Sequence, residues 1–590
     1  IYNINKVISI MKDNIKSRFS SKGKKIIDIN NKVVDNSLKY LKKISIDSSW
    51  VKLEYSDNKK LNFNETINLL NGDTLPVSSF LDVSNGVFEG GTTKNEKRNI
   101  AESIPNWIPE NCSECNKCAF ACPHGVIRPF LLDKDDKKID SIPSIMPKDV
   151  NFAIGINYEE CTGCGLCAVT CPGKMGKKAL EMVSNKRHDK EFDYLLKNNI
   201  NDKYDSNILT SRNISFRTPK FEYSGACAGC GETPYAKLVT QLFGDRMYIA
   251  NATGCSSIWG NSSPSTPYTV TPEGKGPAWS NSLFEDNAEF GYGMLLAQNT
   301  IRDRLKAKVE KIAEKTEDEA VKAAADEYLE TYTVGATNGT ATDKLVAALE
   351  ACDCDCEDKA DVLKNKDFLA KKSQWIFGGD GWAYDIGYGG VDHVLASKKD
   401  INIMVFDTEV YSNTGGQSSK ATKTGATAQF AAGGKETKKK DLAGMAMTYG
   451  YVYVAQIAMG ADFNQTVKAI AEAEAYPGPS LIIAYAPCIN HGIKKGMSKA
   501  QTEEQLAVEC GYWNNFRFNP AAEGNKFSLD SKAPKSEGYQ DFLNGEVRYN
   551  ALKRANPAKA DRLFALNEQE AMERYDYLKK LVDVYAAEKE

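Results

Sequence analysis

Four short apolar runs, each followed by a loop rich in Gly, Asp or Thr, dominate the hydrophobic pattern of the C-terminal part of the chain. Continuous runs of this length are typical of strands buried on both faces of a parallel sheet, with ligand-binding loops at their carboxyl ends. We therefore predict an α/β domain with a parallel sheet over residues 186–590, with a charged linker near residues 186–215 and a Lys/Glu/Ala-rich helical insertion at residues 300–370. The predicted strands are residues 247–250, 374–377, 401–406 and 480–484.

The N-terminal part of the chain has a different pattern. Residues 1–55 place apolar and basic side chains at helical spacing, which predicts two helices without a core of their own. Residues 56–105 combine turn signals at Asn71-Gly72 and Gly90-Gly91 with short β-type runs, as expected of a small irregular domain. Residues 106–185 are expected to form a further small domain around two cysteine runs.

Composition and charge exclude several classes of function. The 590 residues include 75 Lys and Arg against 78 Asp and Glu, a net charge of −3 that is too balanced to indicate nucleic-acid binding. No apolar run approaches the roughly 18 residues of a membrane span, so we expect no membrane insertion. Sixteen cysteines, half of them in the two runs, favour a reducing cell interior over a secreted disulfide scaffold. We expect a soluble, intracellular redox protein.

The two cysteine runs carry the clearest chemistry. Each reads C-x2-C-x2-C-x3-C-P, the spacing with which bacterial-type ferredoxins hold two [4Fe–4S] clusters. Three cysteines two residues apart wrap one cubane, and the fourth, before the proline, reaches the other. Zinc and disulfides are the alternatives, disfavoured because zinc knuckles use one C-x2-C per half-site. The predicted ligands are Cys112, Cys115, Cys118 and Cys171 for one cluster, and Cys161, Cys164, Cys167 and Cys122 for the second.

Two polar loops follow consecutive predicted strands. The first contains Gly379-Asp380-Gly381, and the second runs from Asp407 to Asn413. A G-D-G followed roughly thirty residues later by an Asn-containing loop resembles the thiamine-diphosphate motif, in which a carboxylate and neutral oxygens bind Mg²⁺ and glycines let the backbone approach phosphates. A lone G-D-G is more often a turn, but two such loops after neighbouring parallel strands strengthen the prediction.

Further cysteines lie in loops of the same α/β domain. Cys227, Cys230, Cys255 and Cys488 supply one C-x2-C and two remote partners, which suits a third cubane. A zinc site or four unrelated buried thiols are the alternatives. The CDCDC sequence at residues 352–356 suits neither a cubane nor a usual zinc site, and we predict a surface loop there.

Five segments together closely resemble the pyruvate:ferredoxin (flavodoxin) oxidoreductase family: CSECNKCAFACPHGVIRPFLL, CAGCGETPYAKL, GGDGWAYDIGYGGVDHVLAS, DTEVYSNTGGQSSKAT and YAPCINHG. The resemblance covers nearly the whole chain and implies the C-terminal half of a longer enzyme. NEKRNIA is similar to the EKR-type linker domain of the family, here at residues 56–105. Residues 1–55 would be the tail of a truncated gamma-type domain, residues 106–185 a ferredoxin-like domain, and residues 186–590 the thiamine-diphosphate domain.

The resemblance also implies roles for individual residues. Cys227, Cys230, Cys255 and Cys488 would hold a cluster proximal to thiamine. Asp380 and Thr408 would bind Mg²⁺ through their side chains and Val410 through its carbonyl. Asn413 is the candidate catalytic residue that contacts substrate, and for His491 we predict a loop hydrogen bond, with tuning of the proximal cluster as the alternative. The cofactor would be lined by Glu232, Cys255, Gly379, Asp380, Gly381, Trp382, Thr408, Glu409, Val410, Tyr411, Ser412 and Asn413.

The activity that the resemblance implies is oxidative decarboxylation of pyruvate with coenzyme A, with electrons leaving through three [4Fe–4S] clusters to ferredoxin or flavodoxin. The cofactors are thiamine diphosphate and Mg²⁺, and a homodimer is expected. The carboxylate that activates the cofactor and the main pyruvate-binding residues would lie in the missing N-terminal half. The alternatives are an oxidoreductase for another 2-oxoacid and an electron-transfer module without its own catalysis. We expect a cytoplasmic location, or a hydrogenosome or mitochondrion-related organelle of an anaerobe.

Overall fold

The computed structural model describes residues 3–51, 61–184, 191–205, 207–260, 265–271, 273–353 and 356–586. The chain divides into two compact units, residues 1–75 and 76–590, which are described separately. Within the described residues, no helix combines the length and the apolar character that crossing a membrane requires.

The first unit contains the two helices predicted for the N-terminus. Helices α1 (Ile4–Phe19) and α2 (Lys24–Ser37) pack against each other and are joined by an ion pair between Lys12 and Asp35, 2.5 Å apart. Only Val34 of these two helices is buried, so the expectation of helices without a substantial core is confirmed. The short helices α3 (Ser48–Val51) and α4 (Phe63–Asn68) follow.

The short β-type runs predicted for residues 56–105 are wrong for the described residues 61–102. Helix α4 begins with a capping box, in which the Asn62 side chain accepts from the Glu65 N–H and the Glu65 side chain accepts from the Asn62 N–H. Beyond it, frequent Gly, Pro and Asn residues break the apolar runs before a strand can form, and single 3₁₀ turns result. These are η3 (Gly72–Thr74), η4 (Val77–Val83) and η5 (Thr92–Asn95).

The cysteine runs lie among two small antiparallel sheets. Strand β1 (Ser103–Trp107) pairs with β5 (Leu180–Ser184), so that the two ends of this region lie side by side. Each run ends in a short helix, which carries the third cysteine and stops at the fourth. These helices are α5 (Lys117–Ala121) and α6 (Leu166–Thr170), and the second sheet comprises β2 (Ile127–Asp133), β4 (Val150–Ile156) and β3 (Ile142–Pro143).

The charged linker predicted near residues 186–215 is in part a packed helical segment. Helix α7 (Glu191–Asn198) buries Phe192 and Leu195 against Phe130 and Leu132 of β2. The single short helix α8 (Ser211–Ile214) follows. The high charge of the sequence concealed the two apolar side chains that anchor α7, and His188 lies outside the described residues.

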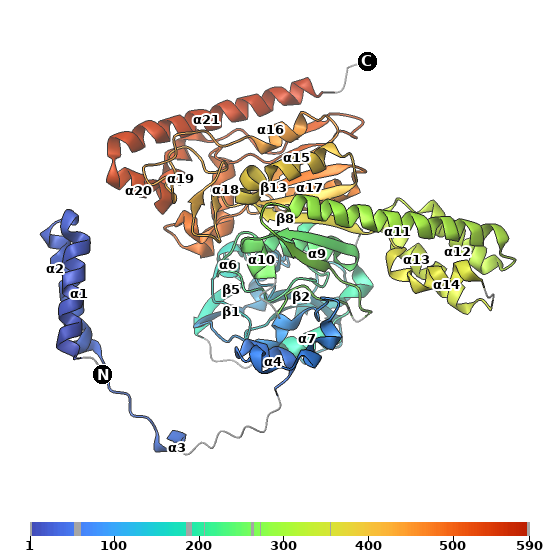
Figure 1. Ribbon diagram of the computed structural model, residues 1–590, viewed down its shortest axis with the longest axis horizontal. Helices are drawn as coiled ribbons and strands as arrows, with labels where there is room; N and C mark the ends of the chain where they lie inside the picture. The colour runs from blue at the N-terminus through green and yellow to red at the C-terminus, as the bar shows by residue number, and fades with distance from the viewer. Residues whose placement is uncertain are drawn as a thin grey trace. The chain divides into compact units, whose positions relative to one another are not determined.

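An eight-stranded sheet forms the centre of the predicted α/β domain (Figure 1). Six neighbouring strands are parallel, and two more continue the sheet through antiparallel pairings. The four predicted runs coincide with four of the parallel strands, so the predicted α/β class with a parallel sheet is confirmed. In spatial order the strands are β15 (Phe527–Leu529), β14 (Phe516–Phe518), β12 (Tyr453–Ile457), β13 (Pro479–Tyr485), β9 (Ile401–Asp407), β8 (Ser373–Gly379), β6 (Met247–Ala252) and β7 (Ala278–Ser282).

Helices cover both faces of this sheet. In β9, Ile403 and Val405 enter one core, whereas Met404 and Phe406 enter the other. Because both faces are buried, the strands read as continuous apolar runs. The first core is closed by α11 (Asn287–Lys315), α15 (Tyr388–Ala396), α16 (Leu442–Met447) and α21 (Pro557–Val584), and the second by α9 (Thr233–Phe243) and α17 (Phe463–Ala475). Helices α10 (Cys255–Gly260), α18 (Ala500–Glu509), α19 (Tyr539–Gly545) and α20 (Val547–Ala555) complete the region.

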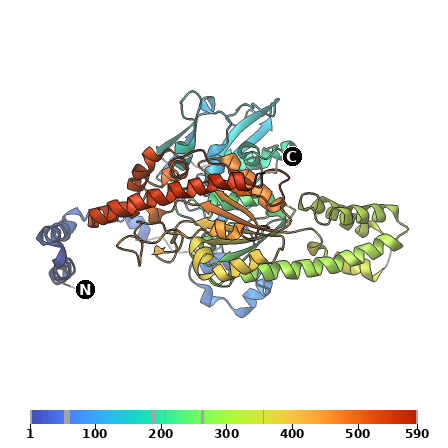
Figure 2. The same cartoon turned by 90° about the horizontal axis from the view of Figure 1, so that it is seen from above.

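The predicted helical insertion is present. Helix α11 starts against the sheet, and its C-terminal half continues into a helical group with a core of its own (Figure 2). The group comprises α12 (Glu319–Glu330), α13 (Gly335–Ala351) and α14 (Glu357–Lys364). Of the CDCDC segment, Cys352 is half-buried and Cys356 is exposed at the start of α14, while Cys354 lies outside the described residues.

Candidate functional site

The two polar loops meet because the strands before them are parallel neighbours. Gly379 at the end of β8 is paired with Phe406 near the end of β9, so Asp380 and Thr408 follow at the same edge. The Thr408 hydroxyl lies 3.0 Å from Asp380 Oδ1 and 3.0 Å from the Val410 carbonyl oxygen. Ser419 Oγ donates to the other carboxylate oxygen of Asp380 at 2.6 Å. The three oxygens predicted to bind Mg²⁺ are therefore brought together.

The electrostatics of this edge suit a cation. Asp380 and Asp407 are both fully buried. Burial raises the pKa of Asp380 well above its usual range, and the neighbouring Asp407 raises it further. Two carboxylates with one lysine, Lys439, at 2.7 Å from Asp407, form a cluster that gains from additional positive charge. A hard divalent ion held by a carboxylate, a hydroxyl and a carbonyl fits this donor set.

The glycine loop after β8 opens into a π-helical turn, η10 (Gly381–Ile386). A Cβ at Gly381 would lie 2.6 Å from the Tyr411 ring, so a larger residue would push the two loops apart. At Gly379 a Cβ would meet only the Phe406 carbonyl oxygen, at 3.9 Å. Trp382 is fully buried in the first core, and this places its side chain in the packing rather than at an open surface.

Glu409, one of the predicted cofactor-lining residues, points its side chain away from the two loops into a buried charge cluster. Its carboxylate lies 2.9 Å from Arg548 and 3.2 Å from Lys439, and the Tyr512 hydroxyl donates to it at 2.5 Å. Burial alone would raise the pKa of Glu409, but Lys439 and Arg548 outweigh it and lower the pKa. The backbone of Glu409 is left-handed, with φ of 60°, and its N–H donates to Asp407 Oδ1 at 3.1 Å while its carbonyl accepts from the Thr422 hydroxyl. Its backbone alone is left to face a cofactor.

His491 connects the second polar loop (residues 407–413), called the metal-type loop below, to the loop that contains Cys488. Its Nε2 lies 2.7 Å from the Thr408 carbonyl oxygen, and the carbonyl can only accept, so Nε2 carries the proton. The ring is fully buried, and burial lowers its pKa to about 3. A neutral His491 thus donates a loop hydrogen bond, as expected, three residues after a predicted cluster ligand.

The four remote cysteines come from the ends of strands and from the loop before α9. Cys255 begins α10 directly after β6, and Cys488 follows β13. The N–H of Gly231 donates to the Pro487 carbonyl at 3.2 Å, which ties the Cys227–Cys230 loop to the Cys488 loop. Burial, together with the nearby Glu232 and Cys227, raises the pKa of Cys488 to about 12. Cys488 interacts electrostatically with each of the other three cysteines of this group.

Glu232 lies in the same group. Its side chain is buried, and Trp259 Nε1 donates to it at 2.6 Å. Burial raises the pKa of Glu232 to about 7, while the Trp259 hydrogen bond acts in the opposite direction. Glu232 therefore lies beside the predicted proximal cluster, in the place where the resemblance puts a cofactor-lining residue.

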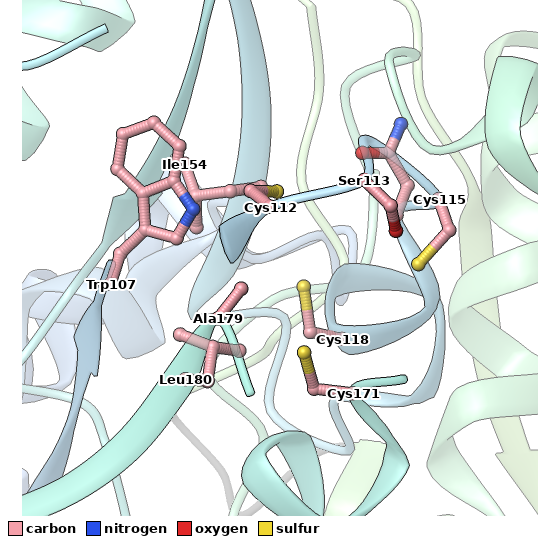
Figure 3. Close-up of a pocket in the computed structure, with 10 residues that line it drawn as sticks. Trp107, Cys112, Ser113, Cys115, Cys118, Ile154, Cys171, Ala179 and Leu180 are labelled. Atoms are coloured by element: carbon pink, nitrogen blue, oxygen red, sulfur yellow. The ribbon is translucent and has the colours of Figure 1, made fainter. Parts of the chain in front are cut away.

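The first predicted ferredoxin-type ligand set lines a small cavity of about 20 Å³. Figure 3 shows Cys112, Cys115, Cys118 and Cys171 around it, with Trp107 and Leu180 on its apolar side. Burial raises the pKa of Cys118 well above its usual value, and the three other thiols raise it further. Thiols that cannot ionise alone in an apolar space are suited to an iron cluster, which stabilises the thiolates.

In the second set too, the fourth predicted ligand comes from the other cysteine run. Burial raises the pKa of Cys167 well above its usual value, and the largest contribution from a neighbouring charge is that of Cys122. Cys161 and Cys164 lie close to Cys122 as well. Across the described part of the chain, no three His, Cys, Asp or Glu side chains converge as ligands of one ion. A cubane spreads its four cysteines over four iron atoms and does not require such convergence.

Two contacts join the ferredoxin-type region (residues 106–185) to the domain that contains the four remote cysteines. These cysteines, called the proximal group below, are Cys227, Cys230, Cys255 and Cys488. The backbone N–H of Gly229, between Cys227 and Cys230, lies close enough to the Cys164 thiol to lower its pKa, against the larger opposite effect of burial. Lys237 of α9 reaches back to α5, where its Nζ donates to the Ala119 carbonyl at 2.5 Å and the Cys122 carbonyl at 2.9 Å. Sequence reasoning missed Lys237, although it is the one charged residue of the apolar helix α9, and this signal could have identified it.

Comparisons with known proteins agree with this geometry. Three family models match: the thiamine pyrophosphate enzyme C-terminal TPP binding domain at residues 364–484, the 4Fe-4S dicluster domain at residues 111–175, and the EKR domain, of unknown function, at residues 62–101. The first covers β8, β9 and both polar loops, and the second covers both cysteine runs. The chain therefore contains a thiamine-type domain and a two-cluster domain.

Several relatives match almost the whole length of this chain. The pyruvate:ferredoxin oxidoreductase of Moorella thermoacetica is 50% identical over 98% of this chain and 51% of its own length. The resemblance to this family is confirmed. Pyruvate-flavodoxin oxidoreductases of Enterobacter agglomerans and Klebsiella pneumoniae are 47% and 46% identical over 98% and 97% of this chain. The chain spans about half the length of the curated relatives it matches.

A solved structure also matches, at low similarity. The 2-oxoglutarate:ferredoxin oxidoreductase of Magnetococcus marinus aligns with 49% of this chain and 68% of its own, at 16% identity and a TM-score of 0.26. This TM-score is too low to establish a common arrangement of domains.

Proposed function

We propose that the chain takes part in the oxidative decarboxylation of pyruvate with coenzyme A, which yields acetyl-coenzyme A and CO₂. Electrons would leave one at a time through three [4Fe–4S] clusters to ferredoxin or flavodoxin. One contact carries the proposal: Cys255 Sγ lies 3.0 Å from Ser412 Oγ. A predicted ligand of the proximal cluster thus touches the loop predicted to hold thiamine. The names of the relatives support pyruvate as substrate and ferredoxin or flavodoxin as acceptor.

Each group of residues has a defined task in this proposal. Asp380, Thr408 and Val410 would hold Mg²⁺, which would supply positive charge for the diphosphate. Thiamine diphosphate, when bound, supplies the carbanion chemistry of decarboxylation. Asn413 is exposed at the end of the metal-type loop, and we assign it to contact with the substrate. The buried surroundings of Asp380 and Glu232 exclude water, which strengthens their interactions with charged groups.

The cysteine groups form the electron path. The proximal group, with Cys255 at the thiamine loop, would hold the cluster nearest to the site of decarboxylation. The Gly229–Cys164 contact favours the Cys161, Cys164, Cys167 and Cys122 cluster as the next carrier. Cys112, Cys115, Cys118 and Cys171 would then hold the last cluster before the external acceptor.

The rest of the enzyme belongs to the proposal as well. A preceding half, covalent or separate, would provide the activating carboxylate, the main pyruvate-binding groups and most of the coenzyme A site. We also propose a homodimer and a cytoplasmic location. Without that half, the chain should hold its clusters but turn over poorly.

The test is the visible absorbance of the cluster-loaded chain under anaerobic conditions, in a complex with the corresponding N-terminal half of the Moorella relative. Bleaching that requires pyruvate, thiamine diphosphate, Mg²⁺ and coenzyme A is expected. The Asp380→Asn variant should lose this bleaching and keep its reduction by dithionite. Bleaching by 2-oxoglutarate but not by pyruvate would overturn the substrate assignment. Clusters that only dithionite reduces, in a complex shown to bind thiamine, would indicate an electron-transfer module instead.

A further inference from the structure

A buried lysine lies between the two ferredoxin-type cysteine groups. Lys237 has 4% of its surface exposed and projects from α9, the helix that follows the Cys227–Cys230 loop. Its ammonium donates hydrogen bonds to the carbonyls of Ala119 and Cys122, at 2.5 Å and 2.9 Å. Ala119 follows Cys118, a predicted ligand of one cluster, and Cys122 is a predicted ligand of the other. The same ammonium therefore lies beside both ligand sets.

A buried ammonium is costly unless negative charge lies close to it. Cys122 and Cys118 act on Lys237 as negative groups, which would be thiolates when they bind a cluster, and Arg128 acts in the opposite direction. The neighbouring Arg128 has a carboxylate of its own, Glu222, with which it forms an ion pair. The positive charge of Arg128 is thus balanced within the protein, whereas that of Lys237 faces the cysteines.

We propose that Lys237 is an electrostatic tuning residue, whose fixed positive charge raises the reduction potentials of both ferredoxin-type clusters. The inference rests on the proposed function only in that the two cysteine groups must hold clusters. Reduction of such a cluster adds one electron and makes or breaks no bond, so the only change is one additional negative charge. A nearby buried cation stabilises that charge, because the low-dielectric interior screens it weakly.

This position has a consequence for direction. The proximal cysteine group is separate from Cys118 and Cys122, and no contact joins it to the Lys237 ammonium among those that the structure describes. Lys237 therefore lowers the energy of an electron on the two ferredoxin-type clusters relative to the proximal cluster. Electron flow away from the thiamine loop becomes favourable without any change in cluster type.

The test is a redox titration of the full 590-residue chain, with dithionite as the reductant and EPR spectra of the reduced clusters as the readout. Lys237→Met removes the charge at similar volume, and Lys237→Gln removes it but keeps a hydrogen-bond donor. Both variants should shift the midpoint potentials of the two ferredoxin-type clusters to more negative values. The proximal cluster should shift less.

Lys117→Met is the matched control. Lys117 precedes Cys118 directly, but its side chain is half-exposed and lies over the Phe463 ring, so water screens its charge. Its removal should shift the potentials much less than either change at Lys237. Equal shifts for both lysines, or a wild-type potential in Lys237→Gln, would overturn the proposal.

Two further outcomes are separable. If both Lys237 variants lose the clusters while Lys117→Met retains them, Lys237 has a structural role and the tuning proposal is wrong. If the wild-type chain itself binds no iron at the cysteine runs, the proposed function fails before the lysine is tested. Wild-type clusters that titrate normally, with unchanged potentials in the variants, would overturn the lysine proposal alone.

Discussion

The two ferredoxin-type cysteine groups and the thiamine-type edge of the sheet both assemble metal-binding side chains, but they do so over very different distances along the chain. Three ligands of each ferredoxin-type group lie within seven consecutive residues, and a short helix orients the third. At the sheet edge, Cys230, Cys255, Asp380, Thr408 and Cys488 come from five separate segments. The parallel pairing of β6, β8, β9 and β13 brings four of those segments to one edge, and the hydrogen bond from Gly231 N–H to the Pro487 carbonyl ties the Cys230 loop to it.

The difference shows what each site depends on. A local cysteine run keeps most of its geometry whatever happens elsewhere in the chain. The sheet edge instead needs supports behind it, and the structure contains them: Lys439 and Arg548 hold Glu409, and His491 holds the Thr408 carbonyl. We therefore expect substitutions far from any ligand to damage the edge more than the cysteine runs.

The largest effect should follow removal of the metal-type carboxylate. Asp380→Asn keeps the shape of the side chain but removes its charge, so the affinity for thiamine diphosphate with Mg²⁺ should fall on the order of 100-fold or more, ~3 kcal/mol. Calorimetric titration of the chain with the cofactor measures this. Asp385→Asn, in the same π-helical turn but paired with Lys420, is the control and should bind normally. Unchanged affinity in Asp380→Asn would contradict the assignment.

Loss of a remote cysteine should affect the sheet edge and leave the two ferredoxin-type groups unchanged. Cys488→Ala should remove the proximal cluster, about four of about twelve iron atoms per chain, and leave both ferredoxin-type clusters in place. Iron analysis and EPR spectra of the reduced chain measure the outcome. Cys510→Ala is the matched control, since Cys510 is a buried thiol of the same region that is not a predicted ligand and whose Sγ donates to the Ala507 carbonyl at 3.6 Å. Full iron content in Cys488→Ala would exclude this cysteine as a ligand.

The support from His491 should matter less than a ligand but measurably. His491→Ala leaves the Thr408 carbonyl without its buried donor, which costs about 1–3 kcal/mol. Cofactor affinity should fall roughly 10-fold, whereas the iron content stays unchanged. His491→Gln, which keeps a donor, should recover part of the loss. An iron content that falls together with cofactor affinity would mean that His491 holds the Cys488 loop rather than the metal-type loop.

The smallest effect is a pH dependence of stability behind the edge. Glu504 is buried and accepts hydrogen bonds from Gly460 N–H and the Tyr235 hydroxyl, and Tyr235 also contacts the Tyr485 carbonyl of β13. Burial raises the pKa of Glu504 to about 8. The folded chain then binds more protons than the unfolded chain between about pH 4.5 and 8, so this group lowers stability as the pH rises through that window.

Glu504→Gln removes this titration. Its melting temperature should match that of the wild-type chain near pH 5 and exceed it by a few degrees near pH 8. Thermal unfolding at the two pH values, followed by circular dichroism, gives the comparison. An equal difference between the two proteins at both pH values would show that Glu504 does not titrate in this range.

Sequence reasoning reached the ferredoxin-type groups through spacing and the sheet through its apolar runs. Strand β12 escaped because Gln456 interrupts its short apolar run, and α7 escaped because Phe192 and Leu195 lie among charges. The supports of the edge could not be read at all. Lys439, Arg548 and Glu409 are ordinary charged residues in the sequence, and only the fold places them in one buried cluster.

The most direct test of the central claim is the metal content of the anaerobically prepared chain, determined by elemental analysis together with Mössbauer spectra. Three cubanes predict about twelve iron atoms per chain, all in [4Fe–4S] form, and no stoichiometric zinc. About eight iron atoms with one zinc would show that the four remote cysteines form a zinc site. That result would contradict the account, because an electron acceptor beside the thiamine loop is its central element.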